Sequence, residues 1–526
     1  MKNIFNIKEN YFYYFIFLYF LTGVYLSLNV GITHDESHSY WVWELNKKNF
    51  LNIFFNTNYD VSQLDTYHGF YGIGFYIFST PIEYLVNLIP NSDIFTLTGR
   101  ILINKHPIVF IFFIISGIYL KNIIYLITKN RNFSFLCSIL FLTYPYLLGH
   151  SFFNIKDIPF MSIWLICTYY LIIILKDFFY KKRIKLSNLF LFSFLTAYLL
   201  SIRVSGILIF IQYLIFVLVF IKVFKFEFIK FIKLFYKNII ISSLAFVIFF
   251  YLMNPNYWED PFKFISSIKF MSQHVQTVCT LTLGECMKAQ YLPSTYIPIW
   301  LFFKLPLIIL FGLILFPFKE KKIFLNKDFA FLIGSLLLTT VVIIFSLILL
   351  NVNLYDELRQ ILFLIPIIFI ISLSTLYFYS KKITSILLII FIIFFTFQNI
   401  KIFPYNYLWL NNFTLFTKIN GVFELDYWGV STKNVSQFLN TQKISKESCI
   451  ISSRHEDFKP FLSNKGLCLK PFKDLHKKNI RPFYALLIER NIKKGVPNNC
   501  KNIHNEKINI NFSKEDLILA KVFVCD

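Results

Sequence analysis

Apolar residues fill long uninterrupted runs along the first three quarters of the chain, and polar residues gather between them. A helix rises about 1.5 Å per residue, so a run of about 20 apolar residues crosses the ~30 Å hydrocarbon core of a bilayer. We count about eleven such runs, and each predicts a transmembrane helix. They lie near residues 11–31, 101–120, 133–149, 159–175, 188–201, 206–221, 238–253, 297–316, 329–350, 360–379 and 383–402.

The segments between these runs alternate in charge. Those that follow odd-numbered runs carry carboxylates, beginning with His34-Asp35-Glu36, whereas those that follow even-numbered runs are basic. Because Lys and Arg are retained on the cytoplasmic side, we expect a cytoplasmic N-terminus and extracytoplasmic carboxylates in a multi-pass protein of a bacterial-type plasma membrane. The basic segments are Lys121–Arg131, Lys176–Lys185, Lys222–Lys237, Lys319–Lys327 and Lys381–Lys382.

One further apolar stretch, His68–Ile89, could be read as another span. It contains three glycines, Pro81 and Glu83, and counting it would move every later basic segment outside. We therefore predict helices that lie in the outer interface, within a first external segment of residues 32–100. A second large external segment covers residues 254–296.

The chain changes character after residue 402. Short strand-like runs at Cys449–Ser453, Tyr484–Glu489 and Leu517–Val524 alternate with polar segments, which predicts a small α/β domain at residues 403–526. The predicted fold is thus an all-α polytopic membrane domain, residues 1–402, followed by an extracytoplasmic α/β domain. Its four cysteines, and the external pair Cys279 and Cys286, could form disulfides or remain thiols, and connectivity cannot be read from spacing.

Composition supports the membrane assignment. Of the 526 residues 56% are hydrophobic, and the mean hydropathy is +0.59. The net charge of +23 could indicate nucleic-acid binding, but its Lys and Arg lie largely in short loops where membrane orientation accounts for them. We therefore expect membrane lipids as partners and no nucleic acid.

Acidic residues beside a membrane span are costly unless they are hydrated, paired or used. Asp35 and Glu36 follow the first run closely, and Asp157 lies in the polar break Asn154-Ile155-Lys156-Asp157 between two later runs. A solvated loop is one reading. Alternatively Asp35 and Asp157 converge, either to share a divalent cation or to divide the roles of base and orienting group. No other cofactor is expected.

Three cations on the same side are candidate phosphate ligands. Arg203 interrupts an apolar stretch, Arg359 follows Asp356 and Glu357, and Lys304 lies just inside a late run. Arg203 could instead extend to solvent, and Arg359 could simply pair with its neighbouring carboxylates. A carboxylate base, phosphate-binding cations and an outer membrane face suit sugar transfer from a polyprenyl phosphate, because its phosphate leaving group needs charge neutralisation more than protonation.

The chain resembles the GT-C membrane glycosyltransferases of the protein O-mannosyltransferase and aminoarabinose transferase (ArnT) type. The resemblance is carried by Gly31–Glu36, Asn154–Pro159, Arg359–Pro366 and Phe423–Gly429, in that order and on one side of the membrane. It implies a GT-C fold and inverting transfer from a lipid-phosphate-linked sugar at the extracytoplasmic face.

The resemblance also implies roles for individual residues. Asp35 would be the base, with Glu36 beside it and Asp157 as the second acidic site, and the donor phosphate would meet Arg203, Arg359 or Lys304. Acceptor contacts would come from His34, His68, Lys156 and Trp258, although Trp258 could equally anchor the interface. These motifs fit a protein, a lipid or a glycan as the acceptor.

Two other classes compete. A transporter or lipid flippase would carry ionisable residues in mid-span and on both faces, but these spans are almost free of charge inside. A noncatalytic assembly protein would use its external domain for binding only. The sidedness of the charges favours the enzyme.

Overall fold

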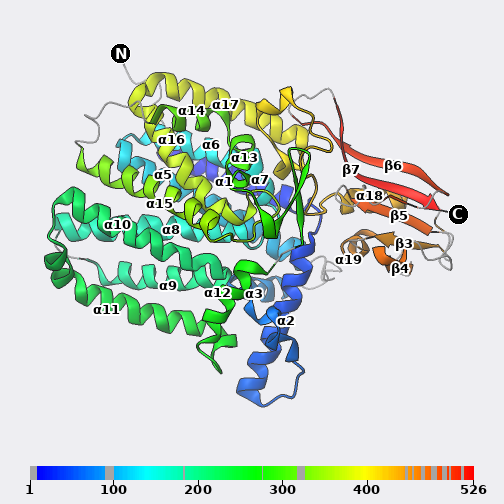
Figure 1. The fold of residues 1–526 in the computed structure, drawn as a ribbon, viewed down its shortest axis with the longest axis horizontal. Helices are drawn as coiled ribbons and strands as arrows, with labels where there is room; N and C mark the ends of the chain where they lie inside the picture. The colour runs from blue at the N-terminus through cyan, green and yellow to red at the C-terminus, as the bar shows by residue number, and fades with distance from the viewer. Residues whose placement is uncertain are drawn as a thin grey trace.

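A computed structural model describes residues 9–88, 100–181, 184–274, 277–316, 326–442, 444, 448–452, 455–463, 468–475, 483–488, 495–496, 499–510 and 515–525. Long helices run side by side along the horizontal axis of Figure 1, and a mixed sheet lies at one end of this bundle. Lys182, Arg183 and residues 319–325 of the predicted basic segments lie outside the described residues, as do residues 89–99.

Every predicted apolar run falls on a helix or on two consecutive helices. These elements are α1 (Glu9–Ser27), α5 (His106–Thr128), α6 (Arg131–Thr143) with α7 (Pro145–His150), α8 (Asp157–Lys176), α9 (Leu186–Ile202), α10 (Ile209–Phe224), α11 (Phe228–Leu252), α13 (Tyr296–Lys304) with α14 (Leu307–Leu315), α15 (Lys327–Leu349), α16 (Ile365–Tyr379) and α17 (Lys381–Ile402).

Among the described residues, seven helical stretches are long and apolar enough to cross a membrane, and the pair α13–α14 makes an eighth candidate. The chain is therefore a multi-pass membrane protein. Fewer elements meet this criterion than the eleven predicted, because α6 has 13 residues and α9 has 17, short of the ~20 that a span needs. Helix α1 is as long as a span but is diluted by tyrosines.

The predicted span at 297–316 is broken into two helices. Helices α13 and α14 meet at an angle of 118°, and Pro306 lies at their junction. Proline has no N–H for the helical hydrogen bond, and its ring clashes with the preceding turn, so the helix cannot continue through it. The break leaves Lys304 at the end of α13, inside the protein.

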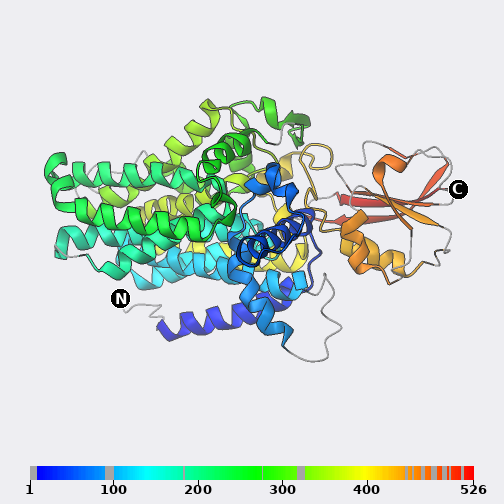
Figure 2. The same ribbon diagram turned by 90° about the horizontal axis from the view of Figure 1, so that it is seen from below.

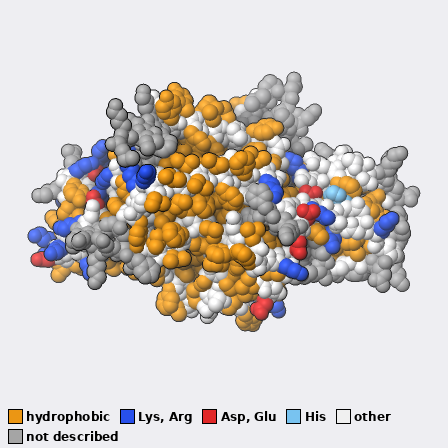
Figure 3. Space-filling view, turned by 90° about the horizontal axis from the view of Figure 1, so that it is seen from above, with side chains coloured by type: hydrophobic (Ala, Val, Ile, Leu, Met, Phe, Trp, Pro, Cys, Tyr) orange, Lys and Arg blue, Asp and Glu red, His pale blue; other side chains and the backbone are white. Residues whose placement is uncertain are grey.

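The surface charge follows the long axis of the molecule. Figure 3 shows a hydrophobic belt over the middle, with Lys and Arg gathered mainly at the end away from the sheet. Asp and Glu gather where the belt meets the sheet domain.

Two helices of the first external segment lie outside the candidate spans. Helix α2 (His34–Phe55) runs across the bundle in Figure 1 and is seen almost end-on in Figure 2. Helix α3 (Gly74–Asn87) has only 14 residues and contains Pro81. Helix α3 agrees with the prediction that His68–Ile89 is not a span. A third external helix, α12 (Lys263–Gln273), follows α11.

The C-terminal sheet has five strands in the order β4-β3-β5-β7-β6, covered by α18 (Thr432–Asn440) and α19 (His455–Phe458). Strand β3 pairs in parallel with β4 and β5, whereas β7 is antiparallel to β5 and β6. The three predicted strands are confirmed. The strands are β3 (Cys449–Ser452), β4 (Cys468–Pro471), β5 (Phe483–Ile488), β6 (Cys500–Ile508) and β7 (Leu517–Cys525).

Six of the eight cysteines form disulfides. Two of these lie in the sheet, Cys449–Cys468 and Cys500–Cys525, and each joins residues directly opposite one another on neighbouring strands. The third, Cys279–Cys286, closes the hairpin of β1 (Cys279–Thr282) and β2 (Glu285–Lys288). The disulfide reading of the external cysteines is thus the one that the structure adopts.

Residues 403–430 connect the last helix of the bundle to the sheet region. Side chains of residues 403–430 pack into the helical core because this stretch is rich in aromatic residues, among them Tyr407, Trp409 and Trp428, which are at most 3% exposed. Each of these rings buries a large apolar area, which favours packing of this stretch against the helices. The sheet domain therefore starts at α18.

Candidate active site

Arg359, with its side chain 8% exposed, lies at the centre of a cluster of charges beside the starts of α2 and α8. Its Nη2 is 2.5 Å from the Asp35 Oδ2, its Nη1 is 3.0 Å from the Asp356 Oδ2, and its Nε is 3.5 Å from the Asp157 Oδ2. Its guanidinium carbon lies 4.2 Å from the centre of the Trp428 ring. One arginine thus joins carboxylates that are far apart in the sequence, as guanidinium geometry allows.

Asp157 is held in place from several sides. It is the first residue of α8, where the helix N-terminus favours a negative charge. Its N–H donates to the Asn154 Oδ1 (2.9 Å), and the Asn154 amide donates to its Oδ2 (3.0 Å). Arg203, the residue that follows α9, donates to its Oδ1. Asp157 is 1% exposed, so its carboxylate is fixed and shielded.

Asp35 is the accessible carboxylate of the pair. Its side chain is 30% exposed against 1% for Asp157, and only its Oδ2 takes part in the contacts with the described residues. Burial alone would raise the pKa of Asp35, but the charges of Arg359 and Lys156 and the hydrogen bond from Arg359 hold it well below its usual value. Asp35 is therefore ionised at neutral pH.

Glu36 points away from this cluster. Its Oε1 is 2.6 Å from the His106 Nε2, and its Oε2 accepts hydrogen bonds from the Thr33 N–H (2.7 Å) and hydroxyl (2.9 Å). With Thr33 it forms the capping box at the start of α2. The structure thus gives Glu36 a positioning role, in which it fixes the helix end that presents Asp35.

Lys156 differs from the other cations of the cluster. Among the described residues no carboxylate lies within ion-pair distance of its ammonium, which sits 4.5 Å from the centre of the Tyr71 ring. Burial lowers the pKa of Lys156 to about 8, with Asp35 opposing and Arg359 and Arg203 reinforcing the shift. Burial and the neighbouring Arg359 similarly lower the pKa of Arg203 to about 10.

Lys304 lies in a second, fully buried ion pair. Its Nζ is 2.7 Å from the Glu357 Oε2, and the side chains are 0% and 1% exposed. Its ammonium also lies 4.5 Å from the centre of the Tyr146 ring. Burial raises the pKa of Glu357 to about 7, although Lys304 pulls it down. The structure does not bring Lys304 into direct contact with Asp35 or Asp157.

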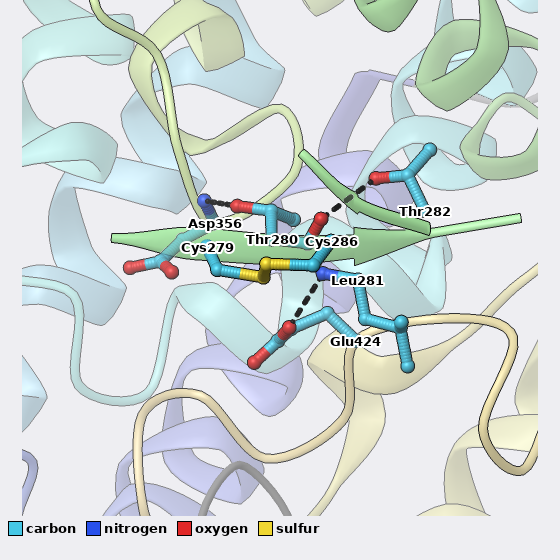
Figure 4. Close-up of a disulfide and its surroundings, with 7 residues drawn as sticks. All are labelled: Cys279, Thr280, Leu281, Thr282, Cys286, Asp356 and Glu424. Carbon is cyan, nitrogen blue, oxygen red and sulfur yellow. Dashed lines mark hydrogen bonds between the residues drawn. A yellow bond between two sulfur atoms is a disulfide. The ribbon is translucent and has the colours of Figure 1, made fainter. Parts of the chain in front are cut away.

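The turn that carries these acids is held by the disulfide hairpin, as Figure 4 shows. Asp356 and Glu357 have φ values of 56° and 65°, a left-handed conformation that costs energy for residues with a side chain. The Asp356 N–H donates to the Thr280 hydroxyl (2.9 Å), next to the Cys279–Cys286 disulfide. The Glu424 carboxylate accepts from the Leu281 N–H (2.8 Å) and ties the hairpin to the Phe423–Gly429 run.

The predicted acceptor residues separate into three places. His34 is 59% exposed and lies 4.0 Å from Asp457 of the sheet domain. His68 pairs with His38, one turn beyond Asp35 on α2. Trp258 donates to the Tyr251 carbonyl (2.6 Å) and packs beside Phe54. Phe54 lies about 28 Å along α2 from Asp35, at ~1.5 Å per residue, so Trp258 is not part of the cluster.

The divalent cation that Asp35 and Asp157 were predicted to share stays a proposal. Within the described part of the chain, no group of three or more His, Cys, Asp or Glu side chains could hold a metal ion. Both Asp35 and Asp157 face Arg359 instead.

Sequence reasoning missed several residues of the site. Asp356 was considered only as a local partner of Arg359, and that pairing is confirmed. His150 is fully buried, with its Nδ1 3.0 Å from the Asn154 amide and its Nε2 3.4 Å from the Tyr427 hydroxyl. Burial holds the pKa of His150 well below its usual value. A histidine beside a polar break between two spans was the available signal.

These observations define a multi-pass membrane protein with a network of carboxylates, arginines and lysines. Its fold is similar to the crystal structure of ArnT from Cupriavidus metallidurans bound to undecaprenyl phosphate, with a TM-score of 0.47, 11% identity and coverage of 97% of each chain. It is also similar to the apo state of that ArnT, with a TM-score of 0.42, 9% identity and coverage of 85% of this chain and 87% of the other. No protein-family model and no curated protein matches the chain.

Proposed function

We propose that this protein is a membrane glycosyltransferase that moves a sugar from a polyprenyl-phosphate donor to an acceptor hydroxyl at the extracytoplasmic face. One observation carries the proposal: Asp35 is the partly exposed carboxylate of a charge network in which Asp157 and Arg359 are buried and which also contains the cations Arg203 and Lys156. A transporter would need such charges along a path through the spans. Here they gather at one end of the helices.

The reaction uses Asp35 as the base. The acceptor oxygen attacks the anomeric carbon of the sugar, and its proton passes to Asp35 as the new carbon–oxygen bond forms. The bond from the anomeric carbon to the phosphate oxygen breaks, and its electron pair leaves with the lipid phosphate. Attack opposite to the leaving group inverts the configuration. Because its pKa is low, Asp35 takes the proton late, once the attacking hydroxyl has become acidic.

The cations divide the remaining work. Arg203, 23% exposed, and Lys156 meet the donor phosphate, since Lys156 has no carboxylate partner among the described residues. Arg359 fixes Asp35 and Asp157 relative to each other. Lys304 acts through Glu357 on the turn before Arg359. A divalent cation shared by Asp35 and Asp157 would require Arg359 to withdraw from both.

Transfer from labelled polyprenyl-phosphate sugars to cell-envelope acceptors tests the proposal, with the full-length protein in lipid nanodiscs. Asp35→Asn removes the base and should lower the rate about 10²- to 10⁴-fold. Asp65→Asn is the matched control, because Asp65 lies in the same external segment with its side chain 85% exposed.

An Asp35→Asn variant as active as the wild type would refute the role of Asp35. Absence of transfer by the wild type from every such donor would instead favour the alternative, a transporter or flippase of envelope glycolipids. Lipid translocation in proteoliposomes then measures that activity directly.

A further inference from the structure

A continuous group of rings covers the surface next to Asp35. Three external segments contribute to it: α2, the turn η2 (Tyr67–Phe70) with the residue that follows, and the end of α12. We call it the imidazole–aromatic platform, and its members are His38, Trp41, Tyr67, His68, Tyr71 and His274.

The rings are in direct contact with one another. The His38 Nε2 lies 3.3 Å from the His68 Nδ1, and the Trp41 ring meets the His68 ring edge-on at 4.8 Å between centroids. The Tyr71 hydroxyl lies 3.3 Å from the His274 Nε2. Because the contacts cross three segments, the platform has a defined shape instead of being a set of independent side chains.

The platform begins at the candidate active site. His38 is three residues from Asp35 on α2, so the two side chains lie on one face of the helix about 5–6 Å apart at Cβ. The Lys156 ammonium lies over the Tyr71 ring on the same side. A molecule resting on these rings would therefore extend to the carboxylate of Asp35.

The platform is open to a ligand. Trp41 is 40% exposed and Tyr67 is 38% exposed, while His38, His68, Tyr71 and His274 are partly exposed. Burial lowers the pKa of His38 to about 4, and it also lowers the pKa of His68 and His274. Neutral imidazoles each offer one hydrogen-bond donor and one acceptor.

We propose that the imidazole–aromatic platform is the acceptor subsite and that it binds a pyranose ring, which makes the acceptor a carbohydrate. This inference rests on the proposed function. A pyranose presents an apolar C–H face to aromatic rings and hydroxyl groups to the imidazole nitrogens, which matches the mixture of surfaces here. A lipid chain or a hydrophobic peptide would cover those nitrogens without hydrogen bonds, and burial of unpaired polar groups costs free energy of binding.

Ligand-observed saturation-transfer NMR with methyl pyranosides tests the binding without any donor. The wild type in nanodiscs should transfer saturation to the pyranoside, and Trp41→Ala and His68→Ala should each weaken the signal about fivefold or more. Trp41→Phe and His68→Asn should retain most of it. Phe54→Ala is the control, because it removes an exposed ring at the far end of the same helix.

Kinetics with a glycan acceptor separates the two proposals. The platform variants should raise the KM for the acceptor about fivefold or more and leave the KM for the donor unchanged. Wild-type protein that transfers sugar but binds no pyranoside, or Trp41→Ala and His68→Ala variants that bind like Phe54→Ala, would overturn the subsite while the proposed function stands. Pyranoside binding at the platform by a wild-type protein that transfers no sugar would refute the proposed function. It would also refute the role of the platform as an acceptor subsite.

Discussion

Replacing Lys304 by methionine should leave the Glu357 carboxylate buried without its cation. The pair is closed to solvent on both sides, with Nζ and Oε2 2.7 Å apart. Removal of one member of a buried ion pair costs about 3–5 kcal/mol, because the remaining charge keeps its desolvation penalty. Methionine fits the space beside the Tyr146 and Trp300 rings, so the loss should come from charge more than from packing.

The magnitude should depend on pH in a known direction. Burial raises the pKa of Glu357 from 4.5 to about 7, and loss of Lys304 should raise it further. A carboxyl group whose pKa is raised by folding destabilises the protein as pH rises through that range, because the unfolded chain then holds fewer protons than the native one. Lys304→Met should therefore lose more stability at pH 8 than at pH 6.

Thermal unfolding in detergent measures the effect. An unfolding entropy of about 2.1 cal/mol/K per residue over 526 residues gives about 1.1 kcal/mol per degree, so Tm should fall about 3–5 °C at pH 8. The double variant Lys304→Met with Glu357→Gln should regain most of this loss, since it removes both charges. Additive losses, with a coupling below about 0.5 kcal/mol, would refute the pairing argument.

Activity of the same double variant separates two roles for Lys304. If Lys304 only holds the turn through Glu357, the double variant should regain transfer together with stability. If Lys304 contacts the donor phosphate, the double variant should be stable yet show a raised KM for the donor.

Three other predictions concern the cations and the hairpin. Because Lys156 has a pKa of about 8 and loses its charge above it, kcat/KM for the donor should fall above pH 8, and Lys156→Met should abolish that alkaline limb in a pH profile. Removing the Cys279–Cys286 disulfide by serine substitution should release the Thr280 contact to Asp356 and lower kcat. Loss of the Cys500–Cys525 disulfide should instead lower the unfolding free energy by about 2–4 kcal/mol with little change in kcat. If Asp35 and Asp157 share a cation, EDTA should stop transfer and Mn²⁺ or Mg²⁺ restore it; unchanged rates in EDTA would contradict the shared cation.

The sequence predicted the helices well because hydrophobic length is a strong and local signal. It missed β4, which has only four residues, and β6, whose residues Lys501, Asn502, His504 and Asn505 give no apolar alternation. It did not show that residues 403–430, which follow α17, pack against the helices. Where an irregular segment packs depends on tertiary contacts that no local pattern records.

The site was predicted in part, and the two Asp-Glu pairs explain where the prediction stopped. Depth beside a membrane span follows from sequence position, which is why Asp35, Glu36, Asp356 and Glu357 were all expected on one side. The direction in which each side chain points does not follow from sequence position, because consecutive residues of a helix point about 100° apart. The left-handed turn at Asp356 and Glu357 likewise sends their two side chains in different directions.

In both pairs the aspartate turns to Arg359 and the glutamate turns to a buried basic side chain, Glu36 to His106 and Glu357 to Lys304. The aspartates therefore form the cluster, and the glutamates fix the two segments that deliver them. Glu36→Gln keeps the hydrogen-bonding shape but removes the charge opposite His106, so it should act mainly on the unfolding free energy, whereas Asp35→Asn should act mainly on the rate. A Glu36→Gln variant as inactive as Asp35→Asn, with an unchanged Tm, would show that the second acid of the pair also takes part in the chemistry.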